Sequence, residues 1–457
     1  MNSLFPVLSL MAFYHNQADA IITLMNQTMK NLKNSLAVPY HRVRGFMAAN
    51  HYDYPASGMT VIGVTGTNGK TSTCFMIHNI LLEAGLKVGL MTTIGNSVDG
   101  KFEESPDHMT TSDARTLNKR LAEMRSAGVQ YLVIEVSSHA LAQGRVFGIP
   151  FDIVVMTNVA SEHLDYHRTF QRYLQAKCRL FKLAAANAKQ GGQGVGIINA
   201  DDKSAKAFAQ LVPKPVTYGI KQGKLKATRI KRQNSGSSYE VKVGSEIYHI
   251  KINIPGEFYI YNSLAAVAAC HALGVSRQQI ENGLKNLAGV DGRMNVISTG
   301  LGFDVIIDFA HTPDAYQKLL PDVKANTKGK VIVISGAAGE RDKTKFPTMG
   351  KIAGKYSDLI ILTEEDARGP VRPQSELVAK GARQAGKTEG KDLLFIDDRV
   401  EAIETAIMKA RKNDVVLLLG MGHEKAMARA NGEYIPWNER QVAEQAIAKR
   451  QKKKVRA

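Results

Sequence analysis

A glycine-rich run at residues 63–71, GVTGTNGKT, constrains the fold more than any other feature of the chain. The preceding Met59–Ile62 is apolar and predicts a buried strand, and the following Ser72–Ala84 predicts a helix. Strand, glycine loop and helix in this order form a phosphate cradle, because glycines let backbone N–H groups approach phosphate oxygens at a helix N-terminus. We therefore expect Lys70 to reach the β- and γ-phosphates of a nucleoside triphosphate and Thr71 to ligate Mg²⁺.

The loop departs from the common spacing G-x-x-x-x-G-K-[ST], since position 64 is valine and an extra glycine lies at position 66. A glycine turn without a ligand rarely carries Lys-Thr at a strand-to-helix junction, so phosphate binding is preferred over a plain turn. The residues expected to contact the nucleotide here are Gly66, Thr67, Asn68, Gly69, Lys70, Thr71 and Ser72.

Length and apolar patterning favour a cytoplasmic protein of several domains. The 457 residues suffice for about three domains. The segment Met1–Ala20 is interrupted by polar residues, and no run approaches the ~20 apolar residues of a transmembrane helix. Three cysteines without metal-ligand spacing are typical of a reducing compartment. They are Cys74, Cys178 and Cys270.

The net charge of +18 and the pI of about 9.6 favour polyanionic partners such as ATP or a nucleotide-linked sugar. Part of the excess lies in the tail at residues 449–456. No basic stripe interleaved with aromatic residues is present, which argues against nucleic acid as a partner.

Two series of apolar runs alternate with helical patterns, and each predicts a parallel sheet covered on both faces. The first comprises Val61–Val64, Val88–Met91, Tyr131–Glu135, Asp152–Asn158 and Val195–Asn199. The second, after a glycine-rich junction at Gly289–Arg293, comprises Phe303–Asp308, Val331–Gly336, Leu359–Thr363, Leu393–Ile396 and Val415–Gly420.

Between the two series, residues 216–254 read as antiparallel hairpins of an accessory sheet, followed by a helix at about Tyr261–Ala272. The predicted fold class is α/β. A short helical N-terminal segment (1–58) precedes a central P-loop-type parallel-sheet ATPase domain (59–291) and a second doubly wound α/β domain (292–457).

Polar residues at the carboxyl ends of parallel strands line the ligand crevice, and Glu135 and Asn158 are placed there. Glu135 is a candidate Mg²⁺ ligand, because the metal needs hard oxygens beside the triphosphate. A solvated carboxylate at a strand end is the alternative.

Ordered blocks of the chain resemble the Mur ligases, which join amino acids to cell-wall precursors through an acyl phosphate. T-G-T-N-G-K-T at residues 65–71 is one such block, and E-V-S-S-H-A-L-A-Q-G-R-V at 135–146 and T-N-V-A-S-E-H-L-D-Y-H at 157–167 resemble the MurE type. The similarity runs from about Thr60 to Glu424. It implies an ATP-dependent ligase that adds a diamino acid to the D-Glu of a UDP-linked muramyl dipeptide.

The resemblance also implies a metal centre with two Mg²⁺ ions. In the family the histidine at the position of His163 binds metal, and the lysine of Y-x-x-A-K, here Lys177, is carbamylated and bridges the metals as an anion. Glu162 replaces the aspartate of the family. The implied metal ligands are Thr71, Glu135, His163 and Lys177.

Residues from Gly256 onward would complete the nucleotide-binding site. The block Gly256–Ala266 is similar to G-x-F-N-x-Y-N-x-L-A-A but has Tyr259 for the first asparagine. The resemblance implies that Asn262 contacts adenine, that Arg293 meets the phosphates from the hinge and that Asp308 holds the ribose. For Asp314, which follows the D-F-A-H-T-P block, we favour a helix-capping role.

The remaining motifs imply two binding groups. The positions that hold the muramyl peptide in the family are Thr110, Thr111, Ser138 and Arg145. Those expected to select the amino acid are Arg341, Asp366, Arg368, Gly420 and Glu424. Arg368 matches the arginine of D-N-P-R and favours the second carboxylate of meso-diaminopimelate. Asp366 replaces the motif's asparagine, and its charge could equally attract the ammonium of lysine.

The first 58 residues do not match the longer UDP-binding domain usual in MurE-type enzymes. Residues 4–37 read as one or two amphipathic helices, which either pack on the central domain or lie on a membrane surface, with packing preferred. Two rival functions stay open: a folate- or cyanophycin-type ligase, and a non-catalytic nucleotide-dependent scaffold. A monomer is expected.

Overall fold

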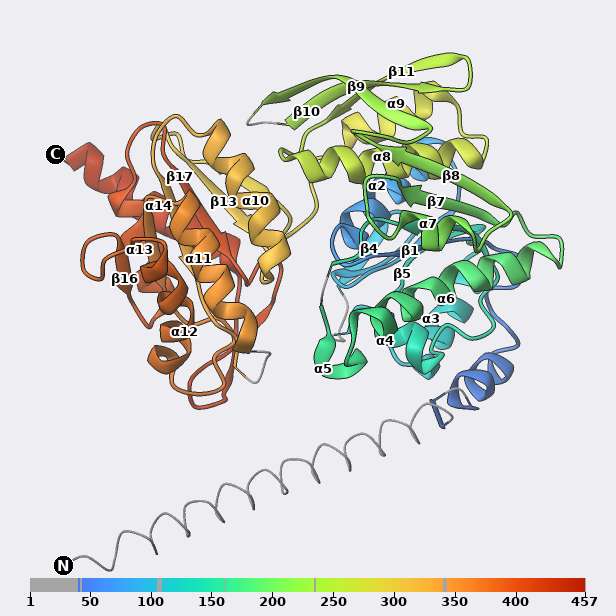
Figure 1. Ribbon diagram of the computed structural model, residues 1–457, viewed down its shortest axis with the longest axis horizontal. Coiled ribbons are helices and arrows are strands. Elements are labelled where there is room, and N and C mark those ends of the chain that lie inside the picture. Colours follow the sequence, from blue (N-terminus) through green and yellow to red (C-terminus); the bar gives the residue numbers. More distant parts are fainter. Residues whose placement is uncertain are drawn as a thin grey trace, which may run out of the picture.

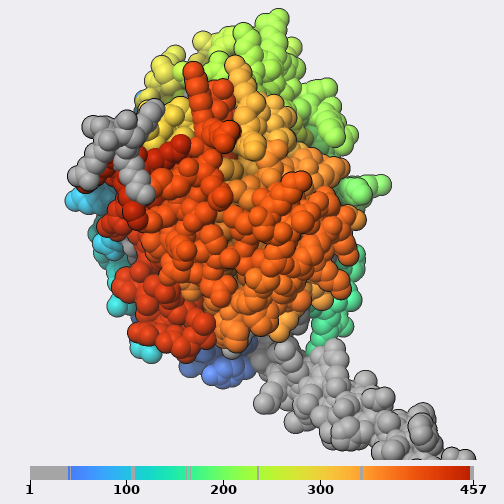
Figure 2. Space-filling model, turned by 90° about the vertical axis from the view of Figure 1, so that its left-hand side faces the viewer, coloured from blue at the N-terminus to red at the C-terminus, as the bar shows by residue number. Residues whose placement is uncertain are grey.

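The computed structural model describes residues 40–456 except 42, 105–108, 161, 234–235 and 340–342. The described chain forms two α/β bodies side by side, joined near residue 290 (Figure 1). Seen from the end opposite the central body, residues coloured orange to red fill most of one face (Figure 2).

The first body is built on one sheet in the order β11-β10-β9-β8-β7-β6-β1-β5-β2-β3-β4. Strand β1 (Thr60–Thr65) lies in its middle, parallel to β5 (Tyr131–Glu135) and β6 (Phe151–Met156). The other parallel strands are β2 (Val88–Met91), β7 (Val195–Asn199) and β8 (Lys214–Gly219). All five strands of the first predicted series are therefore present.

Both edges of this sheet carry antiparallel hairpins. Strands β3 (Gly95–Val98) and β4 (Lys101–Glu104), which sequence patterns did not reveal, extend one edge. Strands β9 (Leu225–Gln233), β10 (Gly236–Val243) and β11 (Glu246–Ile252) extend the other. The hairpins predicted to form an accessory sheet are present, and β9 pairs with β8, which makes them continuous with the main sheet.

Alternate strand residues feed two apolar layers, as the period of a strand requires. Ile62 and Val64 join a cluster with helices α2, α8 and α9, while Val61 joins a cluster with α3 and α6. The helices of this body are α2 (Lys70–Glu83), α3 (Ala114–Ser126), α4 (Ser138–Gln143), α5 (Leu164–His167), α6 (Phe170–Ala188), α7 (Ala205–Ala209), α8 (Glu257–Ala272) and α9 (Arg277–Asn286).

The second body has a sheet in the order β12-β13-β17-β14-β15-β16, parallel except for the edge strand β12. Its strands are β12 (Asn295–Ser298), β13 (Asp304–Asp308), β14 (Val331–Ser335), β15 (Leu359–Leu362), β16 (Leu393–Phe395) and β17 (Val415–Leu419). The second predicted series is thus present, with strands up to one residue shorter at either end.

Helices cover both faces of this second sheet (Figure 1). They are α10 (Pro313–Asn326), α11 (Phe346–Tyr356), α12 (Val371–Gln384), α13 (Arg399–Lys409) and α14 (Glu439–Arg456), with the 3₁₀ turn η1 (Lys343–Lys345). A two-stranded sheet of β18 (Ala426–Ala428) and β19 (Tyr434–Pro436) lies before α14.

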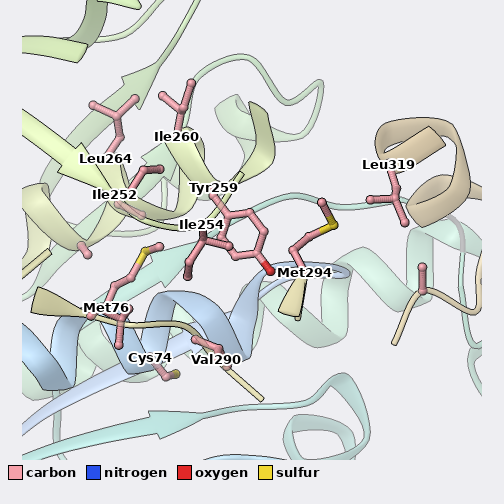
Figure 3. Close-up of a cluster of buried hydrophobic side chains, with 14 of the residues drawn as sticks. Cys74, Met76, Ile252, Ile254, Tyr259, Ile260, Leu264, Val290, Met294 and Leu319 are labelled. Atoms are coloured by element: carbon pink, nitrogen blue, oxygen red, sulfur yellow. The ribbon is translucent and has the colours of Figure 1, made fainter. Parts of the chain in front are cut away.

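One apolar cluster continues from the first body into the second. Figure 3 shows Met76 of α2 and Leu264 of α8 on one side, Val290 and Met294 of the connection in the middle, and Leu319 of α10 on the other. Because these side chains are buried in one cluster, the connection is a packed junction. Burial of apolar surface contributes about 25 cal/mol per Å² to its stability.

A helical segment at residues 43–51 packs against the central body. The rings of Phe46 and Phe147 lie 5.7 Å apart, and a side chain at Gly45 would clash with the carbonyl of Gly144. Tyr40, Val43, Phe46 and Met47 are about half exposed or more. The amphipathic helices expected at 4–37 lie outside the described residues. Among the described helices, none is long and apolar enough to cross a bilayer.

Candidate active site

The phosphate loop lies between β1 and α2, where its glycines permit close backbone approaches. Gly69 adopts φ 84° at the N-terminus of α2, which explains why this helix begins at Lys70, two residues earlier than expected. A side chain at Gly66 would clash with the hydroxyl of Thr157. Lys70 Nζ donates to the carbonyl of Thr67 at 3.0 Å. The backbone N–H groups of this first turn remain available for an anion.

Glu135 is buried at the end of β5, and its carboxylate faces the loop. Its Oε2 accepts from the Thr71 hydroxyl at 2.9 Å and from the hydroxyl and N–H of Thr93 at 3.0 and 3.1 Å. Lys70 Nζ lies 3.7 Å from Oε1. The alternative of a solvated strand-end carboxylate is therefore wrong. Sequence reasoning missed Thr93, although its position just after β2 at the same sheet edge was the signal.

Lys177 of α6 is buried beneath the same loop, and its Nζ donates to the carbonyl of Gly66 at 2.6 Å. Its Nζ lies 4.5 Å from the ring centre of Tyr173, whose hydroxyl lies 3.0 Å from that of Thr67. Burial, and then the nearby charge of Lys70, hold the pKa of Lys177 well below its usual value. The side chain is thus biased toward the neutral amine.

His163, the fourth predicted metal ligand, is more exposed than the others. Its Nε2 lies 3.7 Å from the carboxylate of Glu162, and its ring centre lies 4.8 Å from that of His139. Within the described residues, no three His, Cys, Asp or Glu side chains gather as a ready metal cluster. Of the four predicted metal ligands, only Glu135 and His163 are residues of these types, and the other two are Thr71 and Lys177.

The residues predicted to hold the muramyl peptide adjoin this edge. The Thr111 hydroxyl donates to the carbonyl of Glu135 at 3.0 Å, and Arg145 donates to the carbonyl of Thr111 at 2.7 Å. Ser138 lies 3.0 Å from Nε2 of His167 and is buried. Thr110, next to Thr111, is half-buried. Hydrogen bonds therefore link two of the four residues, Thr111 and Arg145, to the end of β5, while Ser138 contacts His167.

The predicted adenosine residues come from both bodies. Asn262 of α8 is buried against Gly69, and its Nδ2 has no hydrogen-bond partner among the described residues. Asp308 accepts from the N–H of Met294 at 2.9 Å and of Ala310 at 2.8 Å. Burial raises the pKa of Asp308, and the positive charge of Arg293 opposes that rise.

Arg293 stands at the junction of the two bodies, with its guanidinium 4.8 Å from the ring centre of Phe309. The rings of His311 and His423 also lie beside that of Phe309. Burial is the main cause that lowers the pKa of His311 to about 4 and that of His423 to about 3, and the nearby positive charges contribute to both values. Both imidazoles are therefore neutral at physiological pH, and the positive charges that act on them come from Arg293, Lys345 and Lys425.

The expectation that Asp314 caps a helix is wrong. Thr312 is the N-cap of α10, and its hydroxyl accepts from the N–H of Ala315 at 3.2 Å. Asp314 instead accepts from the side-chain amide of Asn68 at 2.5 Å and from Lys318 at 2.8 Å. Its carboxylate thus ties the phosphate loop to the second body, a contact that spans 246 positions of sequence.

The residues predicted to select the amino acid lie around the carboxyl ends of β15 and β17. Arg368 forms an ion pair with Asp366 at 2.7 Å, and Asp366 also accepts from the N–H of Ala428 at 3.1 Å. The guanidinium lies 5.7 Å from the ring centre of Tyr434. Asp366 and Arg368 are thus brought together, whereas Arg341 lies outside the described residues.

Gly420 and Glu424 flank the same strand ends. A side chain at Gly420 would clash with the carboxylate of Glu365, which accepts from the N–H of Gly336 at 3.2 Å. Burial raises the pKa of Glu365 to about 7. Glu424 lines a small pocket with Asp291 and other residues of the junction.

Comparison with known families follows the same division of the chain. The model of the Mur ligase middle domain matches residues 64–270, and the model of the Mur ligase glutamate ligase domain matches residues 292–422.

Two relatives illustrate the similarity. UDP-N-acetylmuramoyl-L-alanyl-D-glutamate--2,6-diaminopimelate ligase 1 of Clostridium acetobutylicum is 39% identical over 414 residues, which cover 89% of this chain and 82% of that protein. UDP-N-acetylmuramyl-tripeptide synthetase of Roseiflexus sp. is 37% identical over 430 residues, which cover 91% and 84%.

Among solved structures, a UDP-N-acetylmuramoyl-L-alanyl-D-glutamate--2,6-diaminopimelate ligase superposes with a TM-score of 0.62 and 28% identity over 87% of this chain and 80% of that chain. Folylpolyglutamate synthase of Mycobacterium tuberculosis has a TM-score of 0.68 at 16% identity over 83% and 92%, a likeness of fold alone. Because two family models span most of the chain and these relatives match along about four fifths of their length, the chain belongs to the Mur ligase family of ATP-dependent amide-forming ligases.

Proposed function

We propose that the chain joins a diamino acid, with meso-diaminopimelate favoured, to the D-glutamate of UDP-N-acetylmuramoyl-L-alanyl-D-glutamate. The observation that carries the proposal is the 39% identity, over 89% of the chain, to a ligase named for this reaction. The arrangement of Lys70, Glu135 and Lys177 around one phosphate loop supports the chemistry.

The chemistry answers a simple difficulty: a carboxylate is a poor electrophile with a poor leaving group. Transfer of the γ-phosphoryl group of ATP to a carboxylate oxygen gives an acyl phosphate and releases ADP. The amine of the diamino acid then attacks the acyl carbon, and inorganic phosphate leaves with the broken C–O bond. Lys70 at the loop and Arg293 at the junction are the side chains suited to stabilise charge on the transferring phosphoryl group.

The residues present fit Mg²⁺. Glu135 supplies a buried carboxylate oriented by two hydroxyl groups, and hard oxygen ligands are what this metal prefers. Thr71, Glu135 and His163 would hold the metal, and we expect two ions in all. When bound, Mg²⁺ supplies positive charge opposite the β- and γ-phosphates.

We also propose that Lys177 is carbamylated. Its pKa is held well below the usual value, so the neutral amine that adds to CO₂ is available. Addition forms an N–C bond and releases one proton, leaving a carbamate whose single negative charge is shared by two oxygens. Lys177 is buried beside Gly66 of the phosphate loop, so a carbamate on it would lie close to Mg²⁺, which would offset its charge.

For the amino acid, Arg368 provides the guanidinium that pairs with a second carboxylate. Asp366 pairs with that guanidinium at 2.7 Å. This ion pair holds the arginine in place and uses part of its set of N–H donors. Lysine brings no second carboxylate to this position. The relatives named for 2,6-diaminopimelate support the same choice.

The rival functions are weaker. The folate-type enzyme shares the fold at 16% identity, far below the 39% of the diaminopimelate ligase. A non-catalytic scaffold has no need of Lys70, Glu135 and Lys177 around one loop. We further infer a cytoplasmic protein, since all three cysteines are free thiols, typical of a reducing compartment. The expected monomer stays a prediction.

A substrate panel tests the proposal. We expect ATP-dependent phosphate release to depend on the UDP-linked dipeptide, and meso-diaminopimelate to exceed L-lysine by about ten- to a hundredfold in kcat/KM, because hydrogen bonds from Arg368 to a second carboxylate would contribute ~1.5–3 kcal/mol. Arg368→Ala should remove most of this preference and leave ADP binding intact.

Arg372→Ala is the matched control, since Arg372 is exposed and pairs with Glu376 and Glu389. It should keep the preference. Better turnover of lysine by the unmodified protein would overturn the amino-acid assignment, and release driven only by a folate-type acceptor would overturn the function.

A further inference from the structure

His167 is a buried histidine that belongs to none of the residue sets predicted above. It is the last residue of the short helix α5, which begins directly after His163, a predicted metal ligand. Only 5% of its surface is exposed. Its ring centre lies 5.3 Å from that of Tyr173 and 5.4 Å from that of His139. A buried imidazole is costly unless its polar nitrogens find partners, so the partner of His167 indicates its role.

The Nε2 atom of His167 lies 3.0 Å from the hydroxyl oxygen of Ser138. Ser138 is the first residue of α4 and is also buried, with 2% of its surface exposed. Because both side chains are shielded from solvent, water competes little for this bond. Ser138 is one of the residues predicted to hold the muramyl peptide, so the bond joins His167 to the acceptor side of the site.

The neighbouring residue of α5 reaches a second member of that predicted set. The Tyr166 hydroxyl accepts from the side-chain amide of Gln143 at 3.3 Å. Gln143 in turn accepts from Nε of Arg145 at 2.8 Å. Two consecutive residues of α5 are therefore bonded to the predicted peptide-binding side chains, His167 directly to Ser138 and Tyr166 through Gln143 to Arg145.

The chemistry of a serine hydroxyl fixes the direction of its bond to His167 when an anion is bound. A hydroxyl has one proton to donate, and an ionised carboxylate, such as the muramyl peptide presents, can only accept. Ser138 can donate to a carboxylate only if Nε2 of His167 carries a proton and donates to the serine oxygen. The other neutral tautomer, protonated on Nδ1, would use the serine proton itself.

We propose that His167 is a positioning residue for the muramyl-peptide acceptor. Its protonated Nε2 holds the oxygen of Ser138 and leaves the serine proton for a carboxylate of the peptide. The inference rests on the proposed function, because it takes the UDP-linked dipeptide as the ligand at Ser138. It concerns the acceptor alone, so the KM for ATP serves as an internal reference.

His167→Gln and His167→Asn test where the donor must lie. The amide nitrogen of glutamine can occupy the place of Nε2, whereas that of asparagine reaches only the place of Nδ1. We expect His167→Gln to keep the KM for the UDP-linked dipeptide within about twofold and His167→Asn to raise it about tenfold, as for loss of one oriented hydrogen bond to an anion. The KM for ATP should change by less than about twofold in both. Equal dipeptide KM values in the two variants would overturn the proposal.

His78→Ala controls for the loss of a buried imidazole. His78 belongs to α2, outside the predicted site residues, and 7% of its surface is exposed. This variant should lower the melting temperature and leave both KM values unchanged. A rise in dipeptide KM equal to that of His167→Asn would show that the effect reports stability, and the positioning role would be wrong.

Ser138→Ala shows whether His167 acts through the serine. Ser138→Ala alone should raise the dipeptide KM, and adding His167→Asn should raise it by no more than about twofold further. Multiplication of the two effects would refute the proposed path through Ser138.

The tautomer provides a readout that is independent of activity. In heteronuclear NMR of the full chain labelled with ¹⁵N in its histidines, the signals of His167 are those that disappear in His167→Gln. We expect a proton on Nε2, and an Nε2 without a proton would contradict the proposal. If the unmodified protein does not turn over the UDP-linked dipeptide, the proposed function fails and this inference fails with it. An active protein whose dipeptide KM is unchanged by His167→Asn refutes the inference alone.

Discussion

Lys70 carries the charge nearest to the expected phosphoryl transfer. Its ammonium lies between the Thr67 carbonyl and Glu135, so removing it leaves that buried carboxylate without its cation. We expect Lys70→Ala to lose more than about 90% of ATP-dependent phosphate release, a barrier increase above ~1.4 kcal/mol. Lys206→Ala, at an exposed lysine of α7, is the control and should retain activity. Retention of more than about a tenth of turnover by Lys70→Ala would contradict the role.

Lys177 offers a different test because its proposed function needs a carboxylate rather than an ammonium. Lys177→Ala should be inactive and should regain part of its phosphate release when formate or acetate is added, since either anion can fill the emptied site. The exposed Lys182 on the same helix supplies the control, and Lys182→Ala should need no rescue. Full activity of Lys177→Ala without any added anion would refute the carbamate.

Residues inside local motifs were the easiest to predict. Glycine-loop chemistry places Lys70 and Thr71 together, because the whole cradle is contiguous in sequence. The role of Asp314 was wrong, because the local pattern contains a helix start but not the loop 246 positions away to which the carboxylate bonds. The spacing of residues within a motif cannot predict a hydrogen bond to a segment that is distant in the sequence.

At the scale of elements, the parallel strands were predictable because each is a short β-branched run buried on both faces. The β3–β4 hairpin was not, since its sequence GNSV and KFEE has no apolar alternation that indicates a strand. The continuity of β8 with β9 was also hidden, because only two residue pairs make the link.

The strand ends of the second sheet place Glu365 in a setting that gives a pH prediction. Burial raises its pKa to about 7, against the effects of Arg399 and Lys345, from an ordinary value of 4.5. A raised folded-state pKa means that its stabilising contribution is complete below pH 4.5 and is lost as the pH rises to about 7. The gain in unfolding free energy of Glu365→Gln over the wild type should therefore be larger at pH 8 than at pH 5, by on the order of 3 kcal/mol.

Thermal or urea unfolding at the two pH values measures this difference. Glu389→Gln is the control, because Glu389 is exposed and hydrogen bonds from Arg372 lower its pKa, so its neutralisation should bring no gain at pH 8. Equal stability of the wild type and Glu365→Gln at both pH values would show that Glu365 titrates normally.

At the scale of the whole molecule, the residues predicted for the site lie on both bodies. Lys70, Glu135 and Lys177 come from the first, and Arg293, Asp308 and Arg368 from the second. The order of motifs along the chain predicts two α/β domains, but not how they meet, because that depends on the packed junction around Val290 and Met294. Ion pairs such as Arg232 with Asp322 at 3.6 Å add to that junction.

The bond between Asn68 and Asp314 gives this arrangement a thermodynamic consequence. If the loop binds the nucleotide phosphates and is also bonded to the second body, the affinity for the nucleotide and the affinity for the amino acid depend on each other. By linkage, whatever factor a bound nucleotide adds to the affinity for an amino acid, the amino acid must return to the nucleotide. The order in which substrates arrive therefore cannot change their total binding free energy.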